Sequence, residues 1–137
     1  MTPESDSTRL TETLAEEVKP FNIEVNAIAA GMVNTRLLDG VLAAKELGGD
    51  QFARVRRLRD TGEGGVPPEL PAALALWLAS DDSHGLTGKL ISAPYDGWRG
   101  WDERRISGFN TSPWFTLRRI DHATLRPLID TITDDVG

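Results

Sequence analysis

The chain has 137 residues, enough for one domain. Hydrophobic residues make up 39% and charged residues 26%, a composition typical of globular domains rather than disordered or membrane-embedded ones. The net charge of −6 disfavours a nucleic-acid partner, because phosphate binding requires a basic face. No apolar run approaches the roughly 20 residues of a membrane span. The sequence contains no cysteine, which excludes disulfides, thiolate catalysis and zinc–thiolate sites. We therefore expect a cytoplasmic protein with no nucleic-acid and no membrane partner.

Residues 2–20 are predicted to form an amphipathic helix. Leu10, Leu14 and Val18 recur at a spacing of four residues, which places them on one face of a helix, and Ala15 widens this apolar stripe. Pro20 ends the helix, because proline has no N–H for the helical hydrogen bond.

Residues 21–31, FNIEVNAIAAG, predict a strand. The apolar character of residues 25–30 is typical of a strand covered on both faces, as in parallel sheets. Gly31 then breaks the run, and polar residues follow from Asn34 onward. Two interpretations stay open here: a plain strand-to-helix turn in which Thr35 caps the next helix, or the rim of a ligand site.

The next part of the chain predicts two helices and a loop. The first helix follows Thr35 and ends at the Gly48-Gly49 pair, and the second begins at Asp50 as its N-cap. Residues 61–68, TGEGGVPP, form a loop on their glycine and proline content. The apolar edges of the helices are Leu37, Leu38, Val41 and Leu42 in the first, and Phe52, Val55 and Leu58 in the second.

Residues 67–82, PPELPAALALWLASDD, predict a further helix that begins with proline. Residues 83–88 turn the chain, and residues 89–93, KLISA, form a second strand. Two strands separated by this much helix are expected to be parallel. The apolar face of the helix is Leu70, Leu74, Trp77 and Leu78.

The tail after residue 95 is rich in tryptophan, arginine and glycine, and residues 116–132 predict one or two weak helices. Its aromatic residues are expected to pack the tail on the body of the protein or on a neighbouring subunit. These residues are Trp98, Trp101, Trp114 and Phe115.

The two strands are too few for the apolar surface that the helices offer. A two-stranded parallel sheet is hard to stabilise alone, since both faces and both edges need cover. We therefore expect the sequence to form part of a larger sheet.

Two long stretches, LTETLAEEVKPFNIEVNAIAAGMVNTRL and GVPPELPAALALWLASDDSHGLTGKLI, resemble the C-terminal half of a short-chain dehydrogenase/reductase. The resemblance covers residues 10–91 and rests on several features in order: an N-A-I-A-x-G strand, a threonine four residues after the glycine, a Pro-Glu helix start, and L-A-S-D-D…L-T-G before the last strand. It implies an α/β fold, a partial Rossmann-like doubly wound parallel sheet with the last two strands and their helices only. Residues 1–97 would be the C-terminal part of an NAD(P)-binding domain, and residues 98–137 a tail extension.

The resemblance also implies an NAD or NADP site at the loop after the first strand. Gly31 would let the backbone approach the nicotinamide ring, the Val33 amide would bind the carboxamide, and Thr35 would add a hydroxyl contact. Ala30 stands where the family usually has proline, so the loop loses a rigid element. Asn26 matches a position of the family that makes structural hydrogen bonds. The helices that follow match the family's variable helices over the substrate.

The catalytic groups of the family are not found in this sequence. The family uses a tyrosine with a lysine four residues later, a serine, and a glycine-rich turn after the first strand. The only tyrosine, Tyr95, has Arg99 at that spacing and follows the last strand, and no G-x-x-x-G-x-G occurs. We expect no catalytic residue in this chain, which reads as an inactive part of an NAD(P)-dependent oxidoreductase acting on an alcohol or carbonyl substrate. The alternative is a non-catalytic remnant that acts only as an association module, as a homo-oligomer.

Two other patterns favour ordinary surface roles. The arginine-rich run 54–59 is typical of a solvated helix face. His84 and His122, with nearby aspartates, match no known spacing of metal ligands, so no metal site is predicted.

A partial sheet predicts that the isolated chain self-associates or aggregates, because its uncovered apolar surface favours association. Sedimentation velocity and thermal melting check this expectation. A sharp, cooperative melt of a monomer would contradict it.

Overall fold

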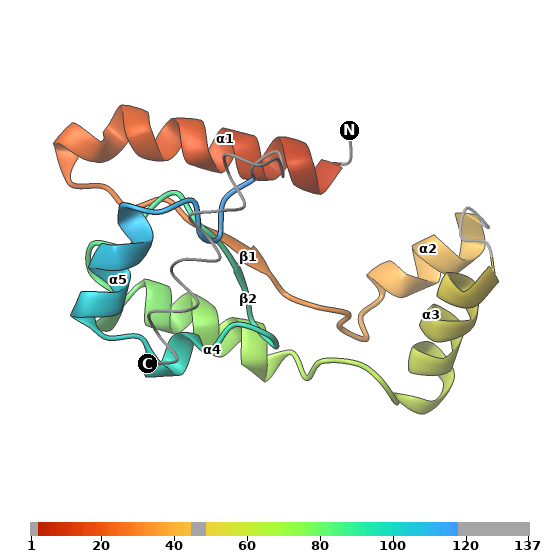
Figure 1. The fold of residues 1–137 in the computed structure, drawn as a ribbon. Coiled ribbons are helices and arrows are strands. Elements are labelled where there is room, and N and C mark those ends of the chain that lie inside the picture. The colour runs from red at the N-terminus through yellow and green to blue at the C-terminus, as the bar shows by residue number, and fades with distance from the viewer. Residues whose placement is uncertain (1–2, 45–48, 118–137) are drawn as a thin grey trace, which may run out of the picture. The chain divides into compact units, whose positions relative to one another are not determined.

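A computed structural model describes residues 3–44 and 49–117 and has an α/β architecture (Figure 1). Strands β1 (Ala27–Ala29) and β2 (Leu90–Ser92) pair as a two-stranded parallel sheet, as predicted. The contacts divide the chain into two units. Unit 1 comprises residues 3–27, 77–91 and 97–117, and unit 2 comprises residues 28–44, 49–76 and 92–96.

Five α-helices and three 3₁₀ turns occur in the described residues. None of these helices has both the length and the apolar character needed to cross a membrane. The α-helices are α1 (Pro3–Val18), α2 (Leu37–Ala44), α3 (Gly49–Thr61), α4 (Glu69–Leu78) and α5 (Glu103–Asn110), and the 3₁₀ turns are η1 (Lys19–Phe21), η2 (Asp81–Ser83) and η3 (Trp98–Gly100).

Helix α5 is an element that the sequence analysis missed. Asp102 caps it, since its Oδ1 accepts the Arg105 backbone N–H at 2.9 Å, and Glu103 lies in the first turn. This acidic start was the signal that could have predicted the helix. The helices predicted for residues 116–132 lie outside the described residues, apart from the first two positions.

Strand β1 is shorter than the predicted strand of residues 21–31, because regular pairing begins only at Ala27. Before it, one side-chain bond and one backbone bond take the place of the regular ladder. The Val25 N–H donates to Thr87 Oγ1 at 3.0 Å, and the Val25 carbonyl accepts the Gly88 N–H at 2.7 Å. In the described sheet β1 pairs only with β2, so its length is limited to the residues that form regular backbone pairs with β2.

The Asn26 side chain joins the same two segments. Its Nδ2 donates to the Leu86 carbonyl at 2.7 Å, and its Oδ1 accepts the Lys89 N–H at 3.1 Å. The side chain thus satisfies one acceptor and one donor of the approach to β2. This confirms the prediction of a structural, hydrogen-bonding role for Asn26.

The core of unit 1 contains a cluster of aromatic rings. Trp98 and Trp101 are buried, and their ring centroids lie 5.6 and 6.0 Å from that of Trp77 at the end of α4. Trp101 also packs on Phe109 at 4.7 Å and on Phe115 at 4.9 Å. The tail therefore packs on its own chain through residues 98–115, whereas its separation as a region of residues 98–137 stays a prediction.

The core of unit 2 includes the pair of helices α2 and α3, which lie side by side (Figure 1). Leu38, Val55 and Leu58 are buried there, and Leu42 packs against them. The predicted apolar edges of both helices are confirmed at these positions. Helix α3 begins at Gly49, which places Asp50 inside the first turn rather than before it.

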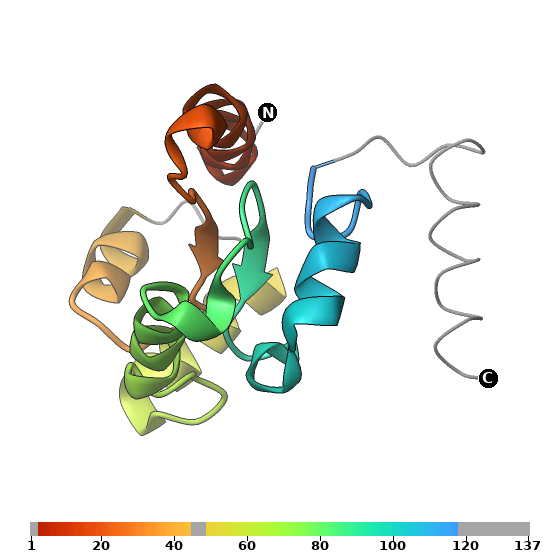
Figure 2. The ribbon, with the colours of Figure 1, turned by 90° about the vertical axis from the view of Figure 1, so that its left-hand side faces the viewer.

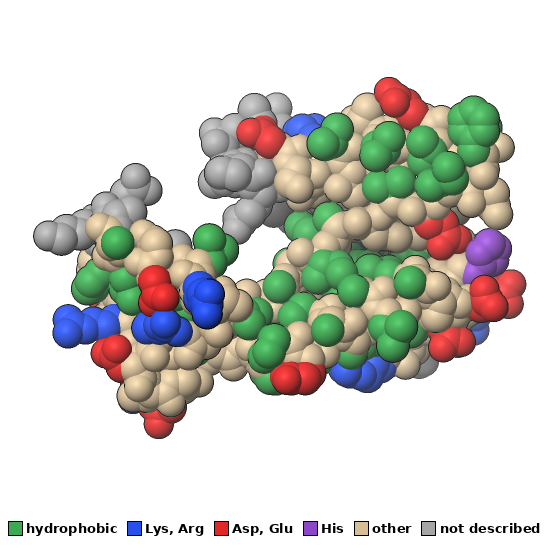
Figure 3. All heavy atoms as spheres, turned by 180° about the vertical axis from the view of Figure 1, so that it is seen from behind, with side chains coloured by type: hydrophobic (Ala, Val, Ile, Leu, Met, Phe, Trp, Pro, Cys, Tyr) green, Lys and Arg blue, Asp and Glu red, His purple; other side chains and the backbone are tan. Residues whose placement is uncertain are grey.

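Only part of the apolar stripe predicted for α1 is buried. Leu10 is 67% and Leu14 is 40% exposed, whereas Thr8 and Ala15 are buried. Small Ala15 lies against Gly88, where an added Cβ would stand 3.5 Å from its methyl group. Figure 3 shows hydrophobic side chains gathered over α1, in agreement with the exposure of Leu10 and Leu14.

Two leucines of α4 give a matched test of this packing. We expect Leu74→Ala, at a fully buried site, to lower the free energy of unfolding by about 2–5 kcal/mol through lost burial and a cavity. Leu76→Ala, at a site 74% exposed, is the control and should change it by less than about 0.5 kcal/mol. Urea unfolding followed by tryptophan fluorescence measures both, and equal losses would contradict the assigned packing.

Candidate functional site: the loop after strand β1

The predicted ligand loop follows the carboxyl end of β1 and lies in unit 2. Its turn residue, Gly31, has a φ of +79°, a conformation that L side chains rarely adopt. A Cβ at this position would lie 2.7 Å from Val66 Cγ2 and 3.1 Å from Pro94 Cγ. The chain's own packing therefore requires glycine here, independently of any ligand.

A single bridge joins the loop to a distant segment. Val33 and Val66 form an isolated parallel bridge, and the Val66 N–H donates to the Met32 carbonyl at 2.8 Å. That bond does not use the Val33 N–H, the donor that the resemblance assigns to the carboxamide. The bridge therefore fixes the loop through the Val66 N–H and does not use the Val33 N–H.

Asn34 ties the loop to helix α3. Its Nδ2 donates to the Leu58 carbonyl at 3.2 Å, and its Oδ1 accepts from Arg59 Nη1 at 3.1 Å. Arg59 also holds Asp39 with two bonds, Nε to Oδ1 at 2.7 Å and Nη2 to Oδ2 at 2.9 Å. Through this bidentate salt bridge to Asp39 and the bond to Asn34, Arg59 connects α2, α3 and the loop. The sequence alone had predicted only a solvated helix face for Arg59.

The other arginines of the run 54–59 behave as predicted where the structure pairs them. Arg56 lies 3.7 Å from Asp60, and Arg57 lies 3.3 Å from Glu63, with all four side chains well exposed. These are surface ion pairs of small energetic value.

The four predicted cofactor residues all lie within residues 30–35 of this loop. Ala30 and Val33 are half-buried, whereas Gly31 and Thr35 are exposed. The Thr35 carbonyl accepts the Leu38 N–H at 3.0 Å, which places Thr35 at the start of α2. The loop thus offers an accessible backbone turn and an exposed hydroxyl group.

Residues 30–35 themselves include no acidic or basic side chain. Tyr95 is 88% exposed, and the Arg99 guanidinium carbon lies 4.2 Å from the centre of the Trp98 ring, in a cation–π contact. Within the described ranges, no three His, Asp or Glu side chains are grouped to hold a metal ion, and His122 lies outside these ranges.

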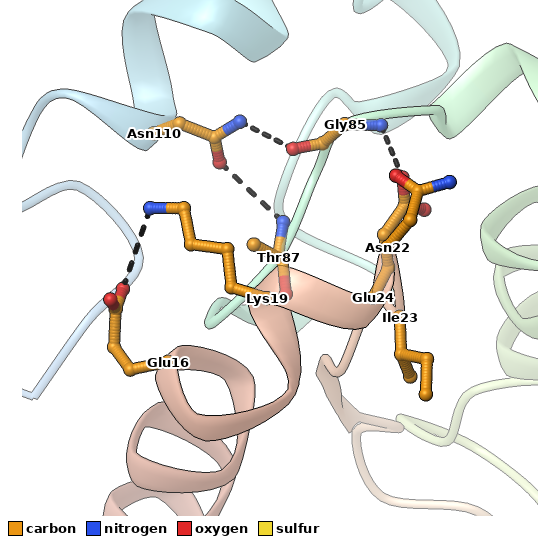
Figure 4. Close-up of a pocket in the computed structure, with 8 residues that line it drawn as sticks. All are labelled: Glu16, Lys19, Asn22, Ile23, Glu24, Gly85, Thr87 and Asn110. Atoms are coloured by element: carbon orange, nitrogen blue, oxygen red, sulfur yellow. Dashed lines mark hydrogen bonds and ion pairs between the residues drawn. The ribbon is translucent and has the colours of Figure 1, made fainter.

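A cavity of about 160 Å³ lies in unit 1 (Figure 4). Glu24 accepts the Gly85 N–H there, and its carboxylate lies 3.1 Å from His84 Nδ1. Asn110 donates to the Gly85 carbonyl and accepts the Thr87 N–H at 3.5 Å. These polar groups hydrogen-bond to one another and thereby link α5 to the turn at residues 84–87. Few of their donors and acceptors remain for a ligand.

Replacement of Gly31 tests the packing of the loop. We expect Gly31→Ala to destabilise the protein by about 1–3 kcal/mol, because the new methyl group meets Val66 and the residue is forced to hold φ at +79°. The control is Gly40→Ala, inside α2 with nothing within 4 Å of the added Cβ, which should stabilise by about 0.5–1 kcal/mol. Thermal and urea unfolding measure both, and a neutral Gly31→Ala would refute the packing argument.

Comparisons with known proteins agree with the resemblance. A family model described as enoyl-(acyl carrier protein) reductase matches residues 7–94. The chain is 39% identical over 88 residues to "Uncharacterized oxidoreductase YxbG" of Bacillus subtilis, an alignment that covers 63% of this chain and 32% of the relative. It is 37% identical over 92 residues to "Short-chain reductase protein NovJ" of Streptomyces niveus, covering 65% and 33% of the two chains.

A third relative is "3beta-hydroxysteroid dehydrogenase 1" of Eggerthella lenta, 42% identical over 82 residues that cover 60% of this chain and 30% of the relative. The chain thus spans about a third of the length of the curated relatives it matches. Since the family model covers well over half of the sequence, the chain belongs to the short-chain dehydrogenase/reductase family.

Proposed function

We propose that the chain is the C-terminal part of an NAD(P)-dependent oxidoreductase that transfers hydride between nicotinamide and an alcohol or carbonyl substrate. The family supports the use of NAD or NADP in general. One observation carries the proposal for this chain: the turn at Gly31 follows the carboxyl end of a parallel strand, where α/β sheets bind their ligands. The loop is held by the bridge to Val66 and by the bonds of Asn34 to α3.

In this proposal the loop contacts the nicotinamide half of the cofactor. Gly31 gives the ring close access to the backbone, and the Val33 N–H donates to the carboxamide. The exposed Thr35 hydroxyl group adds a further hydrogen bond. Ala30 lines the turn without the rigidity of proline.

Helices α2 and α3 are proposed to cover the substrate. They pack on each other through their own small core, so they could move as one body. Gly62 and Gly64 follow α3 with φ of +73° and +80°, and an added Cβ would meet nothing within 4 Å at either position. Such residues are suited to act as a hinge.

Turnover requires a proton-transfer pair that these 137 residues do not contain. Without that pair and a phosphate-binding turn, the loop alone gives weak binding and no reaction. We therefore propose that the chain by itself is inactive.

A second candidate is a non-catalytic association module. The exposure of Leu10, Leu14, Phe21 at 73% and Ile23 at 52% favours it, because these side chains form an apolar surface on unit 1. The coding sequence upstream of Met1 separates the two candidates. An in-frame Tyr-x-x-x-Lys and glycine-rich turn would support the enzyme, and an in-frame stop codon would support the module.

Titration with NADH and NADPH, followed by amide NMR, tests the proposed contacts. We expect no NAD(P)H oxidation, binding in the millimolar range, and resonance shifts confined to residues 30–35, because only the nicotinamide side of a site is present. AMP, which lacks nicotinamide, is the control and should leave these resonances in place. Low-micromolar affinity would contradict the prediction of weak cofactor binding. Resonance shifts only outside residues 30–35 would contradict the proposal that this loop contacts the cofactor.

A further inference from the structure

Strand β2 has two edges, and β1 occupies one of them. The Ala27 N–H donates to the Lys89 carbonyl at 2.8 Å, and the Ala93 N–H donates to the Ala29 carbonyl at 2.9 Å. Alternate residues of a strand direct their backbone groups to opposite edges. Leu90 and Ser92 therefore direct their N–H groups away from β1, to the outer edge.

Both outward donors are taken by the chain itself. The Leu90 N–H donates to the Phe115 carbonyl at 2.8 Å, within unit 1. The Ser92 N–H donates to Asp96 Oδ2 at 2.6 Å, within unit 2, and the Asp96 N–H returns a bond of 3.2 Å to the Ser92 carbonyl. An edge that could otherwise pair with another strand is thus satisfied from within.

Lys89, directly before β2, holds the tail at this edge. The residue is 4% exposed, and its Nζ donates to the carbonyls of Phe109 at 2.6 Å, Ser112 at 3.1 Å and Trp114 at 3.1 Å. A buried ammonium group is costly unless it is hydrogen-bonded, so these three carbonyls are strongly preferred partners. They belong to the end of α5 and the turn after it, where the Phe109 carbonyl also accepts the Ser112 N–H at 3.2 Å.

Ring contacts fix the same segment a second time. Phe115 lies 4.9 Å from Trp101 and 4.9 Å from Phe109, measured between ring centroids. Figure 2 shows α5 on the side of β2 opposite to β1. Polar and aromatic contacts therefore agree on one position for residues 109–117.

We propose that residues 109–117 form an intramolecular cap on the outer edge of β2, which closes this edge to a second copy of the chain. Lys89 is the positioning residue of the cap. The self-association expected from the exposed residues of α1 uses a different surface and leaves the cap in place. Release of the cap exposes the Leu90 N–H to pairing with the same edge of another copy.

Lys89→Met tests the cap, because it keeps an apolar side chain of similar length and removes the ammonium group. At low protein concentration we expect hydrogen exchange of the Leu90 amide to accelerate roughly tenfold, while the Ala27 and Ala93 amides keep their rates. At high concentration the Leu90 amide should regain protection as sedimentation velocity detects larger species. Lys19→Met, at a lysine whose side chain is 66% exposed, is the matched control and should change neither measurement.

Two further variants keep the test independent of a folding defect in Lys89→Met. Lys89→Arg retains a cationic donor and should restore at least part of the Leu90 protection. Asp96→Ala frees the Ser92 N–H alone and should accelerate exchange there without affecting Leu90. Equal acceleration of Leu90, Ala27 and Ala93 in Lys89→Met would overturn the proposal, as would a Leu90 exchange rate in Lys89→Met that stays as slow as in the wild-type chain.

Discussion

The hydrogen bonds on the two edges of strand β2 are the interaction on which the rest of the described structure depends. One edge pairs with β1, which follows α1, and the other edge receives a carbonyl from the segment after α5. Strand β1 and the segment after α5, which lie far apart in sequence, thus both hydrogen-bond to the short strand β2. The side chains of Asn26 and Lys89, which directly precede β1 and β2, add further hydrogen bonds between these segments.

Local patterns in the sequence were sufficient for most helices. The spacing of apolar residues predicted α3 and α4, and proline and glycine predicted the turns between them. The burial of α1 was different, because periodicity finds an apolar face but does not tell which partner covers it. Ala15, rather than the leucines, faces Gly88, since a close approach between backbones needs small residues on both sides.

The strands and the tail depended on contacts between distant residues, which one sequence does not reveal. Strand β1 is short because its pairing ends where Asn26 and Thr87 replace backbone partners with side chains. Helix α5 escaped prediction because its arginine and glycine content conceals a good N-cap at Asp102. The resemblance located the loop at Gly31, but neither its contact with Val66 nor the role of Arg59 is visible in the sequence.

The contacts of Gly31 also change how the motif is to be weighed in evolutionary comparisons. Selection for a folded chain is sufficient to retain this glycine, since a side chain would collide with Val66 whether or not a cofactor is bound. Thr35 differs, because its side chain is exposed and serine, aspartate or asparagine would begin α2 equally well. In descendants that have lost catalysis, the glycine should therefore persist while the threonine drifts. The presence of Gly31 in a relative therefore indicates shared fold ancestry, whereas the presence of Thr35 indicates that the proposed cofactor contact is retained.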